Sequence, residues 1–162
     1  MPIQLLVGQR LPELPVQTPA GEPTTVQAYL SSRATLLYFL HGAWCPACVG
    51  QLHRLQRQRP AIRAAGADLI VVASEDLEAL SAFLESAVPP LEYRVLADPQ
   101  RRLLPLIGGG ADTLAVAIDQ TGLIRWIKRW LHHQAEPSLA VVLQALQDVR
   151  PAAAHRLETP RA

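Results

Sequence analysis

Two cysteines three positions apart are the residues of this sequence best suited to chemistry. Cys45 and Cys48 enclose Pro46 and Ala47, and the chain has no other cysteine. They follow the apolar segment 35–40, which is typical of a buried strand, and they precede a segment with helical spacing. We therefore expect Cys45 at the N-terminus of a helix, with Cys48 one turn further along.

Such a position favours nucleophilic chemistry at the first cysteine. Unpaired backbone N–H groups and the positive end of the helix dipole stabilise a thiolate there. Cysteines so placed have pKa values of roughly 3.5 to 7.5, against about 8.5 for a free thiol. Cys45 is therefore the predicted attacking residue, and Cys48 the resolving residue that closes the disulfide. Pro46 suits the first helical turn, and Trp44 is expected to shield the site and contact a partner.

Two other interpretations of the cysteine pair stay open. In one, both thiols are inert core residues, because buried cysteine behaves as a small hydrophobe. In the other, the pair is half of a zinc site, although no second C-x-x-C and no H-x-x-x-H accompanies it. The other two zinc ligands would come from His41, His53, His132 and His133. The strand–helix junction favours redox use without a metal or other cofactor.

Strands and helices are predicted to alternate along the chain. Strands are expected at 35–40, 67–74, 93–97, 114–119 and 123–130, the last at a sheet edge because of its basic side chains. A short helical turn is expected at 26–30. Helices are expected from Pro46 to Gly66, at 75–86, from Pro99 to 107, and at Glu136–Val149. Pro60 is expected to kink or interrupt the first of these helices. This order predicts an α/β fold, with a mixed central sheet, helices on both faces and an N-terminal extension.

Length and composition predict one domain over residues 1–150 and a flexible tail over 151–162. The 162 residues are 49% hydrophobic and 18% charged, which is enough apolar material for a core. A net charge of +1 provides no strong field for nucleic acid or an acidic membrane. No apolar run reaches the roughly 18 residues of a membrane span. The N-terminus lacks the features of a signal peptide, so we expect a cytoplasmic protein.

Three segments, in this order, resemble a known family. LLYFLHGAWCPACVGQL (36–52) is similar to thioredoxin-fold redoxins, in particular the peroxiredoxin-like alkyl hydroperoxide reductase/thiol-specific antioxidant (AhpC/TSA) branch. LPELPVQTPAGEPTTVQAYL (11–30) resembles that branch's N-terminal extension, and LAVAIDQTGLIRW (114–126) resembles its hairpin. The resemblance covers about residues 8–149. It implies a thioredoxin-like fold and a thiol oxidoreductase whose partners are a protein or small-molecule disulfide, or a peroxide, and a thiol electron donor.

Some family positions are substituted here. The cis-proline that lies against the active cysteines of thioredoxins corresponds to Thr113, which the resemblance therefore implies as a substrate contact. The peroxiredoxin Pro and Thr, seven and three residues before the peroxidatic cysteine, correspond to Tyr38 and Gly42, and the family's Arg near position 113 is missing. These groups polarise the peroxide, so their loss favours disulfide exchange over peroxide reduction.

The proton acceptor of the family is also substituted. Thioredoxins keep a buried Asp where this chain has Phe39, and membrane-anchored thioredoxin-like reductases keep a Glu where it has Gln51. His41 is the nearest titratable side chain, suited to act as a base for Cys48 or as a partner of Cys45. A purely structural role of His41 stays open, and His53, His132 and His133 are expected to be solvated.

The sequence thus predicts a thiol–disulfide oxidoreductase that cycles Cys45 and Cys48 between dithiol and disulfide. Two alternatives remain: a thiol peroxidase that uses the same cysteines, and a non-catalytic redoxin-fold binding module.

Overall fold

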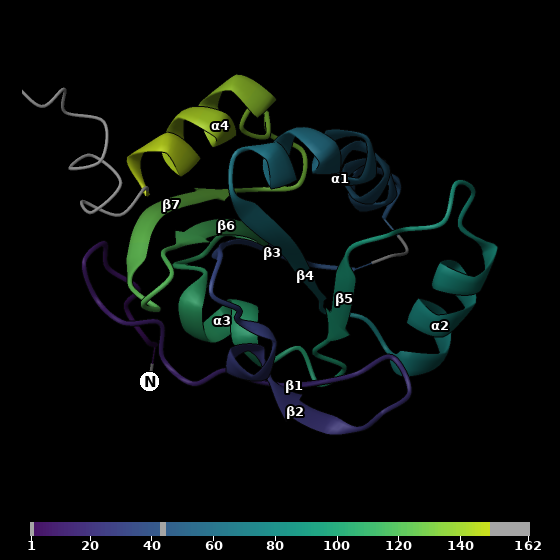
Figure 1. Cartoon of the computed structure of the whole chain (residues 1–162). Helices are drawn as coiled ribbons and strands as arrows, with labels where there is room; N and C mark the ends of the chain where they lie inside the picture. The colour runs from purple at the N-terminus through teal and green to yellow at the C-terminus, as the bar shows by residue number, and fades with distance from the viewer. Residues whose placement is uncertain (1, 43–44, 150–162) are drawn as a thin grey trace, which may run out of the picture.

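A seven-stranded mixed sheet forms the centre of the computed structural model, which describes residues 2–42 and 45–149 (Figure 1). The strand order is β2-β1-β5-β4-β3-β6-β7. The strands are β1 (Pro15–Gln17), β2 (Pro23–Thr25), β3 (Ala34–Leu40), β4 (Ala67–Ala73), β5 (Arg94–Ala97), β6 (Thr113–Ile118) and β7 (Ile124–Trp130). The helices are the 3-10 helix η1 (Val26–Tyr29) and the α-helices α1 (Pro46–Ala64), α2 (Leu77–Ser86), α3 (Leu103–Ile107) and α4 (Leu139–Asp148).

The central strand β3 is apolar at nearly every position because both of its faces are covered. It pairs in parallel with β4 and antiparallel with β6. Alternate side chains point to opposite faces of a strand. Leu36, Tyr38 and Leu40 accordingly belong to one core cluster, and Leu37 and Phe39 to the other. The predicted central strand is confirmed.

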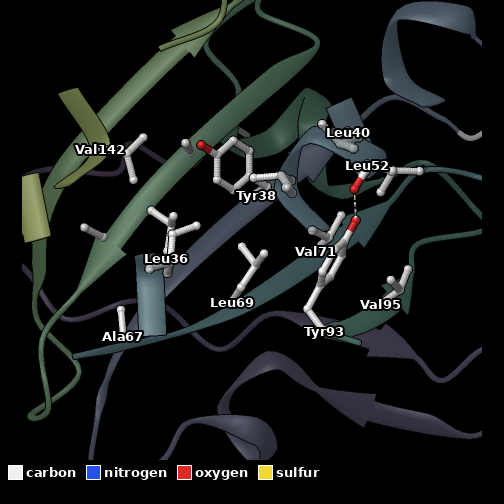
Figure 2. Close-up of a cluster of buried hydrophobic side chains, with 14 of the residues drawn as sticks. Leu36, Tyr38, Leu40, Leu52, Ala67, Leu69, Val71, Tyr93, Val95 and Val142 are labelled. Carbon is white, nitrogen blue, oxygen red and sulfur yellow. Dashed lines mark hydrogen bonds between the residues drawn. The ribbon is translucent and has the colours of Figure 1, made fainter. Parts of the chain in front are cut away.

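The first of these clusters lies between the sheet and helices α1 and α4, which lie above the sheet in Figure 1. Leu52 of α1 and Val142 of α4 pack on it (Figure 2). The buried Tyr93 hydroxyl donates a hydrogen bond of 2.7 Å to the Leu52 carbonyl, which supplies the partner that a buried phenol needs. This bond ties the residue just before β5 to α1, the helix that follows Cys45 and contains Cys48.

The opposite face is covered by α3, η1 and the N-terminal segment. Leu103 and Ile107 of α3, Val26 of η1, and Leu11 and Leu14 are all buried in the second cluster. Figure 1 shows α3 on the side of the sheet away from α1. The predicted mixed sheet with helices on both faces is therefore confirmed, and so is the position of β7 at a sheet edge.

Two predicted helix starts are wrong. The helix expected from Pro99 begins at Leu103, because Arg101 has a φ of 55° and the Asp98 carboxylate accepts the N–H of Leu103 at 2.8 Å. These features make residues 98–102 a turn rather than a helical start.

The final helix, expected from Glu136, begins instead at Leu139. Ser138 is its N-cap and accepts a hydrogen bond from the Val141 N–H at 3.3 Å. A serine in this position satisfies one of the free N–H groups of the first turn. Glu136, outside the helix, forms an ion pair with Arg54 of α1.

Pro60 does not interrupt α1, so of the expected kink or interruption, the interruption is wrong. The helix runs without a gap from Pro46 to Ala64. Pro60 is exposed, so the carbonyl that loses its helical partner lies on the side of the helix that faces solvent.

Some predictions fall outside the described residues. The tail 151–162 and Trp44 are among them.

None of the helices in residues 2–42 and 45–149 combines the length and the apolar character that crossing a membrane requires.

Candidate active site

The two cysteines lie where β3 gives way to α1. Cys45 is the N-cap residue of α1, and its carbonyl accepts the Val49 N–H at 2.9 Å. Pro46 is the first helical residue and is exposed, whereas Cys48 lies within the first turn. Both thiols are free and buried, with exposed fractions of 5% for Cys45 and 3% for Cys48. The local geometry expected for the motif is therefore present.

The Cys48 thiol is held in its protonated form. Burial is the largest cause and raises its pKa to about 12. The charge of Cys45 and a hydrogen bond with its sulfur act in the same direction, while backbone hydrogen bonds at Gly42 and His41 act against it. Cys48 therefore needs a proton acceptor before it can act as a nucleophile.

His41 follows the last residue of β3 and lies beside both cysteines. A ring nitrogen of His41 and the two sulfur atoms all lie within 4.8 Å of one another. Burial, the largest cause, lowers the pKa of His41; the Asp112 carboxylate opposes this effect, while His132 and Arg101 add to it. The imidazole is therefore neutral at pH 7 and has a lone pair that can accept a proton.

Asp112 and His132 extend this cluster. The sequence offered His132 only as one of four possible zinc ligands, and it did not indicate Asp112. The Asp112 carboxylate is 2.5 Å from Nδ1 of His132 and accepts the His132 backbone N–H at 2.7 Å. Its Oδ2 atom is 4.0 Å from Nε2 of His41. The His41 and His132 rings meet edge to face, with centroids 4.5 Å apart. His132 is thus an exposed loop residue, as predicted, and it also belongs to the cluster beside the cysteines.

Strand pairing brings these residues together. In the β6–β7 hairpin Thr113 pairs with Trp130, so the segment before β6 meets the segment after β7. Phe39 of β3 pairs with Leu114 of β6, which brings the end of β3 to the same place. Counting outward from the predicted turn at 120–122 pairs Asp112 with residue 130. A β-bulge between Ala117 and Ile118 shifts the pairing by one residue, so the extension of the observed register places Asp112 opposite residue 131.

Two cavities flank the cluster. One of about 310 Å³ is lined by Cys48, Thr113 and His132, with Gln51 and the Arg54–Glu136 ion pair also in its wall. Another, of about 400 Å³, is lined by His41, Asp112 and Arg101. The structure thus places Thr113, the first residue of β6, in the wall of a cavity that also contains Cys48.

The other two histidines belong to neither set of clustered ligand atoms, although the His133 ring packs edge to face against His132, with centroids 5.3 Å apart. His53 is half-buried, with its ring edge to face against Phe83 of α2, so the expectation of a solvated residue is wrong there. His133 is exposed, as predicted.

The residues of the site could also bind a metal ion. Two sets of three ligand atoms share His41: one with Cys45 and Cys48, the other with Asp112 and His132. A structural zinc site has four ligands at tetrahedral positions. The set that contains both cysteines offers three, so the four-ligand arrangement of the zinc interpretation is not assembled by these described residues.

Comparison with solved structures shows which fold this is. A yeast mitochondrial 1-Cys peroxiredoxin has a TM-score of 0.74 at 17% identity, covering 88% of this chain and 75% of its own. A peroxiredoxin-like protein from Aquifex aeolicus has a TM-score of 0.72 at 21% identity, with 91% and 90% covered. A putative thiol:disulfide interchange protein DsbE from Chlorobium tepidum has a TM-score of 0.69 at 19% identity, with 88% and 99% covered. The fold is thioredoxin-like.

Comparison at the level of sequence places the chain in a family. No curated protein matches it closely enough to count as a relative. The model of the AhpC/TSA family, however, matches residues 7–127. That match includes β3, both cysteines and the β6–β7 hairpin up to Ile127. Because it spans well over half of the sequence, the chain belongs to the AhpC/TSA family, as the resemblance of residues 36–52 predicted.

Proposed function

We propose that the protein is a thiol–disulfide oxidoreductase in which Cys45 attacks and Cys48 resolves. The observation that carries this proposal is the contact between two free thiols at the N-terminus of α1. Burial and the sulfur of Cys45 raise the pKa of Cys48, so Cys48 stays protonated. Cys45 is the N-cap residue, at the positive end of the helix dipole, which favours a thiolate there even though its side chain makes no capping hydrogen bond. Cys45 is therefore the proposed nucleophile.

The reaction has two steps. The Cys45 thiolate attacks one sulfur of a substrate disulfide, forms a Cys45–substrate S–S bond and releases the other substrate half as a thiolate. Cys48 then loses its proton and attacks Cys45. The Cys45–Cys48 bond forms, the Cys45–substrate bond breaks, and the second half leaves with the electron pair. The substrate is reduced by two electrons, and the cysteine pair is oxidised by two. A thiol donor reverses this change to complete the cycle.

His41 is the proposed acceptor of the Cys48 proton. Its ring nitrogen is within 4.8 Å of the Cys48 sulfur, a separation that a small side-chain rotation or one water molecule can close. Because burial lowers the pKa of His41, the ring is neutral at pH 7 and able to accept. The substituted carboxylate positions, Phe39 and Gln51, offer no competing base.

Substrate contacts are proposed for Trp44, Pro46 and Thr113. Pro46 is exposed at the start of α1, next to Cys45. Thr113 shares a cavity wall with Cys48, where the family's cis-proline would stand. Both cysteines are buried, so a substrate must approach over these neighbouring residues to reach sulfur.

Reduction of insulin disulfides with dithiothreitol as donor tests this function. The wild type should accelerate insulin reduction, and its thiol count should fall from two to zero on oxidation. Cys45→Ser should lose the acceleration, while His53→Asn, a change on the same helix away from the cysteines, should retain it. Full activity in Cys45→Ser would contradict the assignment.

Peroxide reduction is a second candidate, favoured by membership of the AhpC/TSA family. The peroxide would oxidise the Cys45 thiolate to a sulfenic acid, with release of water or an alcohol, and Cys48 would then condense with it to a disulfide. Tyr38 and Gly42 replace the family's peroxide-polarising groups, so we expect slow consumption of hydrogen peroxide beside fast disulfide exchange. A peroxidase rate above the exchange rate would reverse this order.

A further inference from the structure

The Asp112 carboxylate lies between two imidazoles. It contacts the ring and the backbone of His132 and faces Nε2 of His41 at 4.0 Å. A third contact, from the Thr113 hydroxyl at 3.2 Å, fixes its other oxygen from the start of β6. The carboxylate is therefore held by two neighbouring strand ends and directed at the ring beside the cysteines.

Exposure rises steadily along this cluster. Cys48 is 3% exposed, the His41 side chain 14%, and the His132 side chain 39%. Closing a disulfide between these buried thiols requires the Cys48 proton to leave. The order of the three side chains runs from the buried thiol to a side chain in contact with solvent.

We propose that Asp112 and His132 are positioning residues that hold the His41 ring against the cysteine pair and connect it to solvent. We call the route of the proton from Cys48 through His41 towards solvent the relay. It rests on the proposed function, because it serves the step in which Cys48 closes the disulfide. His41 receives the proton directly, whereas Asp112 and His132 act through His41.

The relay moves one proton from Cys48 while the electron pair leaves with the substrate. The Cys48 S–H bond breaks and the proton bonds to His41, as the Cys48 sulfur attacks the mixed disulfide on Cys45. The released substrate thiolate carries the electron pair. The imidazolium then gives its proton to solvent, or to that thiolate, along the His132 side, and returns neutral for the next cycle.

Charges around His41 give the two positioning residues opposite effects. The carboxylate of Asp112 raises the pKa of His41, whereas His132 lowers it. The groups that face the His41 ring are Cys45, Cys48, Asp112, His132 and Arg101. A proton acceptor must be neutral, so the rate of closure should fall as the pH drops through the pKa of His41.

Single-turnover release of a chromophoric aromatic thiol from its symmetric disulfide measures this step. The first equivalent reports attack by Cys45, and the second reports closure by Cys48. In the wild type the rate constant of the second phase should fall as the pH drops through the pKa of His41. We call this falling part of the pH profile its acid limb. His41→Asn should slow the second phase by about 100-fold, the usual contribution of a general base, and abolish its acid limb.

The variants of the neighbours provide the sharper readout. Asp112→Asn should move the acid limb of the second phase to lower pH, and His132→Asn should move it to higher pH. Asp112→Glu, which restores a carboxylate, should return the limb towards the wild-type position. His53→Asn is the matched control, since it removes an imidazole from α1 away from the cysteines, and it should leave the limb in place.

Each outcome is decisive. Limbs that move in the same direction in Asp112→Asn and His132→Asn, or that do not move, overturn the relay. An acid limb retained by His41→Asn does the same. If the wild type releases only one equivalent, the proposed function itself fails and the relay fails with it. Melting temperatures of all variants identify any that do not fold. If Asp112→Asn does not fold, the shift of the acid limb to higher pH in His132→Asn is the test, and an unmoved limb there overturns the relay.

Discussion

Two aspartates at opposite ends of β6 have similar surroundings at first sight, but we assign them different roles. Asp112 precedes the strand and Asp119 follows it. Burial acts to raise the pKa of each carboxyl, yet hydrogen bonds bring both below the usual value, Asp119 to about 2. The partners differ, however. Asp119 accepts from the turn residues Thr121 and Leu123 and from Arg125, whereas Asp112 faces two histidines.

The identity of the partners decides what each carboxylate can do. Backbone amides, a hydroxyl and a guanidinium do not change protonation near neutral pH, so Asp119 provides a constant contribution to stability. Imidazoles do change protonation in that range, so Asp112 can act on a reaction. A lowered pKa alone therefore does not separate a structural carboxylate from a functional one in this hairpin.

The largest effect on stability is expected at the turn. Asp119→Ala should lower the free energy of unfolding by about 2 kcal/mol, because the side chain is largely buried and satisfies two turn amides and Arg125. Urea denaturation measures this loss. Insulin reduction by the folded variant should stay at the wild-type level. A strong loss of activity would contradict a purely structural role for Asp119.

The same carboxylate predicts how stability depends on pH. Its pKa falls from 3.8 to about 2 on folding, so its contribution is complete above about pH 4 and is lost as the pH falls towards 2. Wild-type stability should decrease over that window more steeply than the stability of Asp119→Ala. Equal slopes in thermal melts between pH 2 and pH 4 would show that Asp119 does not carry this dependence.

A smaller loss of stability is expected at the other end of β6. Asp112→Asn should cost no more than about 1 kcal/mol, since the carboxylate and His132 are both partly exposed and an amide can still accept the backbone N–H of His132. Its main effect should be on the pH profile of disulfide closure. A loss of stability as large as that of Asp119→Ala would favour a structural role for both.

The smallest effect is expected at Thr113. Thr113→Val removes the hydroxyl that donates to Asp112 and keeps the shape of a buried side chain. We expect a change of less than about 1 kcal/mol in stability and a modest rise in KM for disulfide substrates. An unchanged KM would remove Thr113 from the proposed substrate contacts.

Local sequence signals were enough to predict the cysteine end of the site. An apolar strand, a C-x-x-C motif and Pro46 at the first helical position are contiguous, so the strand–helix junction followed from short-range rules. The central position of β3, the edge position of β7 and the two covered faces followed from alternation and charge.

Long-range pairing was needed for the other part of the site. Asp112 and His132 are 20 residues apart and meet through the register of β6 with β7, which single-residue properties do not indicate. The helix starts at Leu103 and Leu139 were missed for a related reason. Each depends on one side chain, Asp98 or Ser138, that binds a particular backbone N–H.

Trapping the mixed disulfide tests the central claim most directly. Cys48→Ser and Cys45→Ser are each incubated with the same aromatic disulfide, and intact mass with peptide mapping locates the adduct. The account predicts a stable adduct on Cys45 in the Cys48→Ser protein, and far slower labelling of Cys48 in the Cys45→Ser protein. Faster labelling of Cys48 would contradict the assignment of attacking and resolving residues.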